Sequence, residues 1–219
     1  MLSREQASAM LSLQAEMNRK IDPQWVAAAY PYLRAVIVEG SEAIEHHGWK
    51  WWKKQERDLA QLQMELVDIW HFLLSEILLR EGGDQKRALT SLIRLLDAKT
   101  VDEEIDFDGR TWRLDRLNLL EKFELLIGLS ANRRIDLTLF GSILRGCEME
   151  WLDLYRQYIG KNVLNTFRQD HGYKEGSYRK LWSGREDNEF LAEILAAADP
   201  EQPDYRELVY SELAKRYPA

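Results

Sequence analysis

Apolar side chains recur at intervals of three and four residues along most of the 219-residue chain. This spacing is typical of amphipathic helices and differs from the alternation expected of strands. The sequence contains only five prolines and twelve glycines, so long stretches are free of residues that break helices. We therefore expect an all-α fold, built as a bundle of helices.

Capping and turn residues divide this pattern into separate helices. Asp22 and Pro23 suit the N-cap and first position of a helix, Gly82 and Gly83 suit a helix end, and Asp84 suits the next N-cap. The helices are expected over residues 4–20, 23–47, 55–80, 85–98, 115–131, 136–167, 186–197 and 204–215.

Two segments interrupt the helical pattern. Residues 101–115 contain Asp108-Gly109, a tight-turn signal between weakly alternating positions, which leaves open a short hairpin or an irregular loop. Residues 168–185 contain glycines and are expected to form a loop. Because the sequence shows no internal repeat, we expect one domain over residues 1–219, with room for a mobile lobe.

Composition narrows the function and the location. The formal net charge is −7, whereas proteins that coat nucleic acids or bind membrane surfaces need an excess of Lys and Arg. The apolar stretches are interrupted by charges before the roughly 20 residues that a bilayer span needs. The N-terminus lacks the pattern of a signal peptide, and Cys147 is the single cysteine. These features predict a cytoplasmic protein without nucleic-acid or membrane partners.

Two pairs of acidic residues stand among apolar neighbours. Glu39 and Glu42 are three apart, as are Glu65 and Asp68, so each pair shares one face of a helix. Burying unpaired carboxylates is costly, and bound cations relieve the cost. On two antiparallel helices the pairs would face each other and offer four oxygen donors, which suits Mg²⁺. A solvated acidic face remains an alternative, as does a register using Glu45 with Glu42.

A basic segment lies about a hundred residues downstream. Residues 161–185 hold six cationic side chains against two anionic ones, Asp170 and Glu175. Its cationic and hydrogen-bonding residues, with one just beyond it, are Lys161, Asn165, Arg168, Tyr173, Lys174, Tyr178, Arg179, Lys180, Arg185 and Asn188. Such a set suits a polyphosphate, although a solvated loop that balances the acidic remainder is the alternative. Together, the acidic and basic segments indicate metal-assisted chemistry on a nucleotide.

Three motifs resemble one family. The E-G-S-E of residues 39–42, the E-L-V-D of residues 65–68 and KNVLNTFRQDHGYKEGSYRKLWSGREDNEFL at residues 161–191 are similar to the dimeric all-α dUTPases. These belong to the all-α nucleoside triphosphate pyrophosphatases, with the MazG-like and dCTP pyrophosphatase groups. The resemblance extends over about residues 13–191 and is weakest over 84–135. It implies a helical bundle with a carboxylate-lined metal site between antiparallel helices.

The resemblance also assigns roles to residues. It implies that Glu39, Glu42, Glu65 and Asp68 bind two or more Mg²⁺ ions, which Mn²⁺ can replace, and that Glu39 or Glu42 orients or deprotonates the attacking water. Phosphate and sugar contacts would come from Lys161, Asn165, Arg168, Tyr173, Lys180 and Asn188. The base would contact the amides of Gln14 and Asn18, the ring of Trp52 and, unless it is a packed core residue, His71.

The implied reaction is Mg²⁺-dependent hydrolysis of dUTP or dUDP to dUMP by metal-activated water, with release of pyrophosphate or phosphate. A homodimer is also expected, because the helices at 115–131 and 136–160 carry many apolar positions: Leu117, Leu120, Phe123, Leu126, Ile127, Leu139, Ile143 and Leu144. The alternatives are a pyrophosphatase for dCTP or a modified nucleotide, and a helical regulatory binding protein without catalysis.

Overall fold

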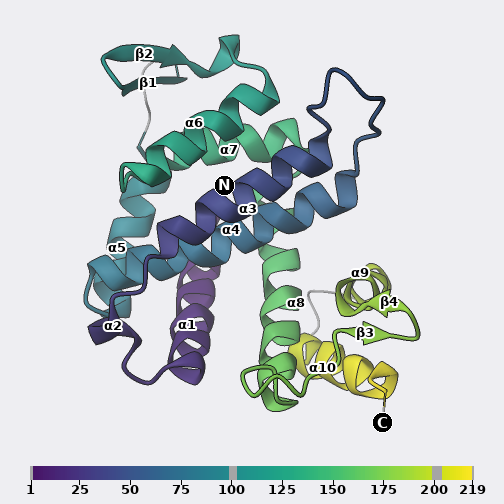
Figure 1. The fold of residues 1–219 in the computed structure, drawn as a ribbon. Coiled ribbons are helices and arrows are strands. Elements are labelled where there is room, and N and C mark those ends of the chain that lie inside the picture. The colour runs from purple at the N-terminus through teal and green to yellow at the C-terminus, as the bar shows by residue number, and fades with distance from the viewer. Residues whose placement is uncertain (1, 99–102, 199–203, 219) are drawn as a thin grey trace.

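Two long antiparallel helices, α3 (Tyr32–His47) and α4 (Leu59–Arg80), run side by side through the middle of the molecule (Figure 1). The computed structural model describes residues 2–98, 103–198 and 204–218. Helix α4 is apolar on most of its faces because neighbouring helices cover it, and Leu66, Val67, Ile69 and Trp70 are fully buried. The central pair therefore provides two long, fixed surfaces that face each other.

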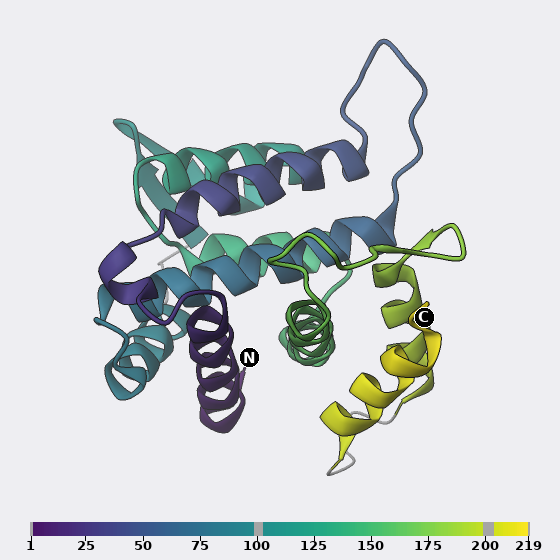
Figure 2. The ribbon, with the colours of Figure 1, turned by 60° about the horizontal axis from the view of Figure 1, so that its bottom comes forward.

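Further helices cover both sides of this pair. Helices α1 (Arg4–Ile21), α5 (Gln85–Leu96) and α8 (Trp151–Asp170) pack on α4, while α6 (Leu119–Ala131) packs on α3 and α7 (Leu137–Gly146) on α6 (Figure 2). The buried apolar residues of these helices join into one cluster. This arrangement confirms the predicted all-α bundle.

The C-terminal elements pack against α8. Helices α9 (Asp187–Ala197) and α10 (Tyr205–Arg216) contact α8 and each other, next to the short antiparallel strands β3 (Leu181–Trp182) and β4 (Arg185–Glu186). The ring of Phe167 on α8 contacts the rings of Tyr178, Trp182, Tyr210 and Tyr217. This aromatic cluster fixes residues 178–187 beside the last turns of α8.

The segment around Asp108-Gly109 forms a hairpin, which settles the alternative left open by the sequence. Strands β1 (Glu104–Phe107) and β2 (Arg110–Arg113) are antiparallel, with Phe107 paired to Arg110. Both turn residues have positive φ, 52° at Asp108 and 68° at Gly109, as a two-residue hairpin turn requires. A short 3₁₀ turn, η2 (Leu114–Arg116), leads on to α6.

The predicted helix over residues 23–47 is wrong, because the structure divides it. A single turn, α2 (Trp25–Ala28), ends at Ala29 in the left-handed region with φ 49°, and α3 begins only at Tyr32. Pro31 explains the break, because a proline disfavours helical backbone at the residue before it. Pro23 lies in a turn before α2 rather than at the first position of a long helix.

The predicted helix over residues 136–167 is also divided. Helix α7 ends at Gly146, Glu148 has φ 56°, and α8 begins at Trp151. A reciprocal capping box between Glu150 and Asp153 starts the new helix. The other predicted helices are present, with ends displaced by a few residues, and residues 99–102 lie outside the described ranges.

The apolar residues offered as a dimer surface belong mostly to the core of one chain. Five of them are at most 3% exposed: Phe123, Leu126, Leu139, Ile143 and Leu144. They pack inside the bundle, so their number does not require a partner. None of the helices in the described ranges is long and apolar enough to cross a membrane.

Candidate active site

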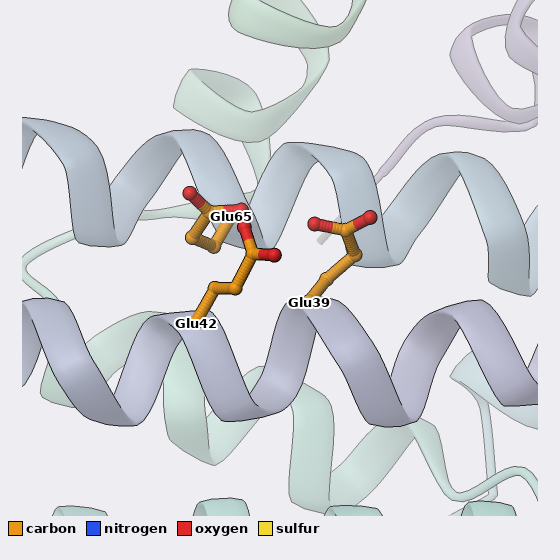
Figure 3. Close-up of side chains that lie close together, drawn as sticks. All are labelled: Glu39, Glu42 and Glu65. Atoms are coloured by element: carbon orange, nitrogen blue, oxygen red, sulfur yellow. The ribbon is translucent and has the colours of Figure 1, made fainter.

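Three carboxylates meet between the two central helices. Glu39 and Glu42 lie three apart on α3, and Glu65 faces them from α4, with the side chains turned towards one another (Figure 3). One carboxylate oxygen from each lies within 4.8 Å of the others. The antiparallel helices that the family resemblance implies are present, and three of the four predicted carboxylates meet between them.

Burial disfavours the charged form of these carboxylates. It raises the pKa of Glu39, and the nearby charge of Asp68 raises that pKa further. The pKa of Glu65 is raised by the same two causes, in the same order. Glu39 and Glu65 therefore keep their protons to higher pH than ordinary glutamates do, and a cation bound beside them would favour the charged form. His46, one turn after Glu42, places its Nε2 atom 3.4 Å from Glu65.

Asp68, the fourth predicted ligand, has a different partner. It lies one turn after Glu65, where its carboxylate forms an ion pair of 2.9 Å with Nζ of Lys161 on α8. Lys161 is only 3% exposed and also donates a hydrogen bond to Oδ1 of Asn188. Glu45 points elsewhere, because it accepts hydrogen bonds from Trp49 and Lys50 in the loop that follows α3.

A cavity of about 460 Å³ adjoins the acidic cluster. Helices α1, α3, α4 and α8 all contribute to its wall. The predicted site residues that line it are Gln14, Asn18, Glu39, Asp68, His71, Asn165, Arg168 and Tyr173. The sequence did not indicate the other lining residues, which include Trp25, Tyr32, Phe72 and Ser75. Residues far apart in the sequence, from Gln14 to Tyr173, thus meet in one cavity beside the carboxylates.

At one part of the wall, a buried hydrogen-bond network joins Gln14 to Asn18, His71, Ser75 and Tyr158. Oε1 of Gln14 accepts hydrogen bonds from Nδ1 of His71 at 2.7 Å and from the hydroxyl of Tyr158 at 3.0 Å. Nε2 of Gln14 donates to Oδ1 of Asn18 and to Oγ of Ser75. Because Oε1 can only accept, the proton of His71 lies on Nδ1, and burial lowers the pKa of His71 to about 4.

This network leaves two buried atoms without a protein partner. Nε2 of His71 and Nδ2 of Asn18 are buried and make no hydrogen bond to the described residues. With the proton on Nδ1, Nε2 of His71 is an acceptor, whereas Nδ2 of Asn18 is a donor. Asn18 and His71 both line the cavity, so this wall holds one unsatisfied acceptor and one unsatisfied donor, while both amide atoms of Gln14 are already used.

Arg168 lies on another part of the wall, in a dense set of hydrogen bonds. Its Nε and NH2 atoms donate to the two carboxylate oxygens of Asp187, each at 2.8 Å. NH1 donates to Oδ1 of Asn165, and NH2 lies 3.4 Å from Oδ1 of Asn188. Asn188 therefore links Arg168 to Lys161, and two cations stand close to Asp68.

A sequence model of the dUTPase family matches residues 6–173, which include the acidic cluster, Lys161 and Arg168. The chain belongs to the all-α dUTPase family. Membership identifies it as a dUTP diphosphatase, an enzyme that hydrolyses dUTP. A comparison with curated proteins gives no significant match.

Dependence on a divalent metal is general among dUTPases of this family, and the acidic cluster fits such an ion. All three donors are carboxylate oxygens, the ligands that hard cations such as Mg²⁺ and Mn²⁺ prefer. Burial, then repulsion from Asp68, raises the pKa values of Glu39 and Glu65, so the charged carboxylates need further positive charge beside them. A divalent cation would supply that charge.

Four predicted contacts of this dUTPase do not line the cavity. Lys161 and Asn188 lie behind its wall, bonded to Asp68 and Arg168, whereas Trp52 and Lys180 lie away from it. Trp52 is 58% exposed in the loop after α3, where its ring contacts Trp51 edge-to-face with centroids 4.5 Å apart. Lys180 is half-exposed and pairs with Glu186. Conversely, the sequence did not indicate Asp187, which is completely buried against Arg168. Its position beside Asn188 in a basic segment was the only signal.

Proposed function

We propose that the chain is a Mg²⁺-dependent dUTPase that converts dUTP and dUDP to dUMP. The uracil base would contact Asn18 and His71, and the phosphates would lie towards Arg168, Lys161 and the acidic cluster. The observation that carries this proposal is the pair of buried, unpartnered atoms in the wall, the acceptor Nε2 of His71 and the donor Nδ2 of Asn18.

The two atoms favour uracil over cytosine. Uracil presents a donor, N3–H, between two carbonyl acceptors, so it can satisfy His71 and Asn18 together. Cytosine presents an acceptor at N3, so in the register that sets N3 of the base against Nε2 of His71, two acceptors would face each other. A buried polar group left unpaired costs about 1–3 kcal/mol. We therefore expect dCTP to be a much poorer substrate, by about 100-fold.

At the phosphate end, the chain supplies cations and a base. Lys161 and Arg168 offset the charge that develops on the phosphoryl group under attack. Glu39 or Glu42 accepts the proton of the water that attacks the β-phosphorus, and the bond from this phosphorus to the bridging oxygen breaks, so that dUMP leaves. Glu39, Glu42 and Glu65 would hold Mg²⁺, which would supply positive charge near the phosphates and make water more acidic. Because the γ-phosphate takes no part in bond breaking, dUDP is also a substrate.

Rates on dUTP, dUDP, dCTP and dTTP, with Mg²⁺ and with a chelator, test this proposal. We expect hydrolysis of dUTP and dUDP only with a divalent ion, and ¹⁸O from labelled water in the pyrophosphate. Label in dUMP would contradict attack at the β-phosphorus. Equal rates on dUTP and dCTP would contradict the proposed base contacts.

One variant and its control address the base contact directly. His71→Phe keeps a ring in the wall but removes the acceptor, so kcat/KM for dUTP should fall by about 10-fold or more and the preference over dCTP should shrink. His171→Phe is the matched control, because His171 stacks on Phe167 and does not line the cavity. An unchanged preference in His71→Phe would remove His71 from base recognition.

We also propose a homodimer, as the family resemblance implies. Exposed apolar residues support it, since Tyr30 before α3 and Val38 on its outer face remain 42% and 49% exposed. Light scattering at micromolar concentration should give twice the mass of the chain. A cytoplasmic location stays a prediction from the composition.

A further inference from the structure

The carboxylate of Asp187 is completely buried and pairs with the guanidinium of Arg168. Both of its oxygens accept from Arg168 at 2.8 Å, and Oδ2 also accepts from the hydroxyl of Tyr178 at 2.8 Å. Burial alone would raise the pKa of Asp187, but the hydrogen bonds from Arg168 and Tyr178 outweigh it and lower that pKa. Asp187 is therefore ionised in the fold and forms a two-pronged ion pair.

This ion pair determines which part of Arg168 faces the cavity. A guanidinium has five N–H donors in a rigid plane. Asp187 engages Nε and NH2, and Asn165 takes one donor of NH1. The second donor of NH1 has no assigned hydrogen bond within the described part of the chain, and Arg168 lines the cavity. The Nε–NH2 edge of the guanidinium thus faces Asp187, and the NH1 edge is left for a ligand in the cavity.

The same short segment also contacts the second cation. Asn188, the next residue, accepts from Lys161 at 3.1 Å. Residues 178–188 lie beyond the match to the dUTPase family, which ends at Tyr173. They are anchored by the hydrogen bond from Tyr178 to Asp187, by a backbone hydrogen bond from Asp187 to Lys180, and by the packing of Trp182 on Phe167.

We propose that Asp187 is a positioning residue of the dUTPase reaction: it holds the guanidinium of Arg168 so that its NH1 edge meets the phosphates of the nucleotide. Tyr178 in turn holds Asp187. The C-terminal segment thereby completes the phosphate end of a site whose other residues lie within the family match. This inference rests on the proposed contact between Arg168 and phosphate.

A double-mutant cycle tests the positioning role. Asp187→Asn keeps the shape of the side chain but removes its charge, and should lower kcat/KM for dUTP by about 10-fold or more. Arg168→Met should lower it at least as far. Because Asp187 acts through Arg168, the double variant should be no worse than Arg168→Met alone. Binding of deoxyuridine, measured by calorimetry, should be unchanged in all three variants, because this ligand has no phosphate.

Each outcome of the cycle decides a different point. Additive losses, or a loss of deoxyuridine binding in Asp187→Asn, would show a general structural role and overturn the inference while leaving the phosphate contact standing. Wild-type kinetics in Arg168→Met would refute the phosphate contact itself, and the inference with it.

A matched control and a milder variant complete the design. Glu193→Gln removes another arginine-paired carboxylate from α9, but its partner Arg185 does not line the cavity, so kinetics should stay at the wild-type level. If Asp187→Asn does not fold, Tyr178→Phe takes its place in the double-mutant cycle with Arg168→Met. Removing one hydrogen bond to Asp187 should give a smaller loss, about 3-fold to 10-fold, that again disappears when Arg168 is absent. Wild-type kinetics or an additive loss in Tyr178→Phe would overturn the inference.

Discussion

Glu39 lies where the acidic cluster meets the cavity. Glu39→Gln keeps the shape of the side chain but removes a charge that would hold the metal, so dUTP hydrolysis should fall by about 100-fold or more. Without metal, this variant should melt at or above the wild-type temperature, because repulsion from Asp68 and Glu65 is relieved. Activity assays and calorimetry in chelator measure both effects.

Glu45→Gln is the control for that variant. Glu45 lies on the same helix but pairs with Lys50 outside the cluster, so this change should leave hydrolysis intact. If Glu39→Gln instead retained most activity, Glu39 would have no part in the reaction.

The acidic cluster also predicts how stability depends on pH. Burial, then Asp68, raises the pKa of Glu39 from 4.5 to about 8 and that of Glu65 to about 7. A raised pKa in the folded state means stability that is complete below pH 4.5 and is lost as the pH rises towards 8. The metal-free protein should therefore melt at lower temperature at pH 8 than at pH 5.

Added Mg²⁺ should abolish that decline, because the cation pairs with the ionised carboxylates. The double variant Glu39→Gln/Glu65→Gln should show little decline even in chelator. A melting temperature that rises from pH 5 to pH 8 in metal-free wild type would show that the two carboxylates are already ionised in the fold.

The sequence could indicate site residues whose chemistry shows in their spacing. Glu39 and Glu42 are an example, because the helical repeat alone places them on one face of a helix. That Glu65 faces them from a second helix was implied by the family resemblance. The sequence could not indicate that both amide atoms of Gln14 bond to other side chains of the protein, because its partners His71 and Tyr158 come from distant segments. Asp187 was missed for the same reason, since its role depends on a contact with a helix that ends 17 residues earlier.

The sequence predicts where helices occur better than it predicts whether a long helix is interrupted. Apolar periodicity persists across Tyr30-Pro31 and across residues 147–150, so the pattern alone indicates unbroken helices in both places. The local signals were present, a proline in one case and the Glu150–Asp153 capping pair in the other. Of the two N-caps predicted, Asp84 does cap α5, whereas Asp22 lies at the C-terminal end of α1.

Asp84 provides a prediction for a single helix. Its carboxylate accepts hydrogen bonds from the backbone N–H groups of Lys86 and Arg87 at the start of α5. Asp84→Ala should reduce the free energy of unfolding by about 1 kcal/mol, measured by urea denaturation. Asp84→Asn should lose much less, because an amide oxygen can also cap a helix. Equal losses in the two variants would contradict the capping role.

On the scale of the whole molecule, the cavity depends on the complete bundle. Its wall combines α1 near one end of the chain with α8 more than a hundred residues later, and the central helices lie between them. Fold class follows from local periodicity, and the predicted all-α class was confirmed. The shape of the cavity and the exposure of single side chains depend on long-range packing, as the buried positions of Phe123 and Leu139 show.

The loop between α3 and α4 holds three exposed tryptophans whose intrinsic fluorescence can report on the site. Among the eight tryptophans of the chain, Trp49, Trp51 and Trp52 are 37%, 86% and 58% exposed. Their emission should therefore lie at long wavelength and be quenched by acrylamide. If Trp52 covers the base as the family resemblance implies, dUMP with Mg²⁺ should shield part of this emission. Trp52→Phe should abolish the shielding. If acrylamide quenching of the wild-type protein is the same with and without the nucleotide, Trp52 does not cover the base.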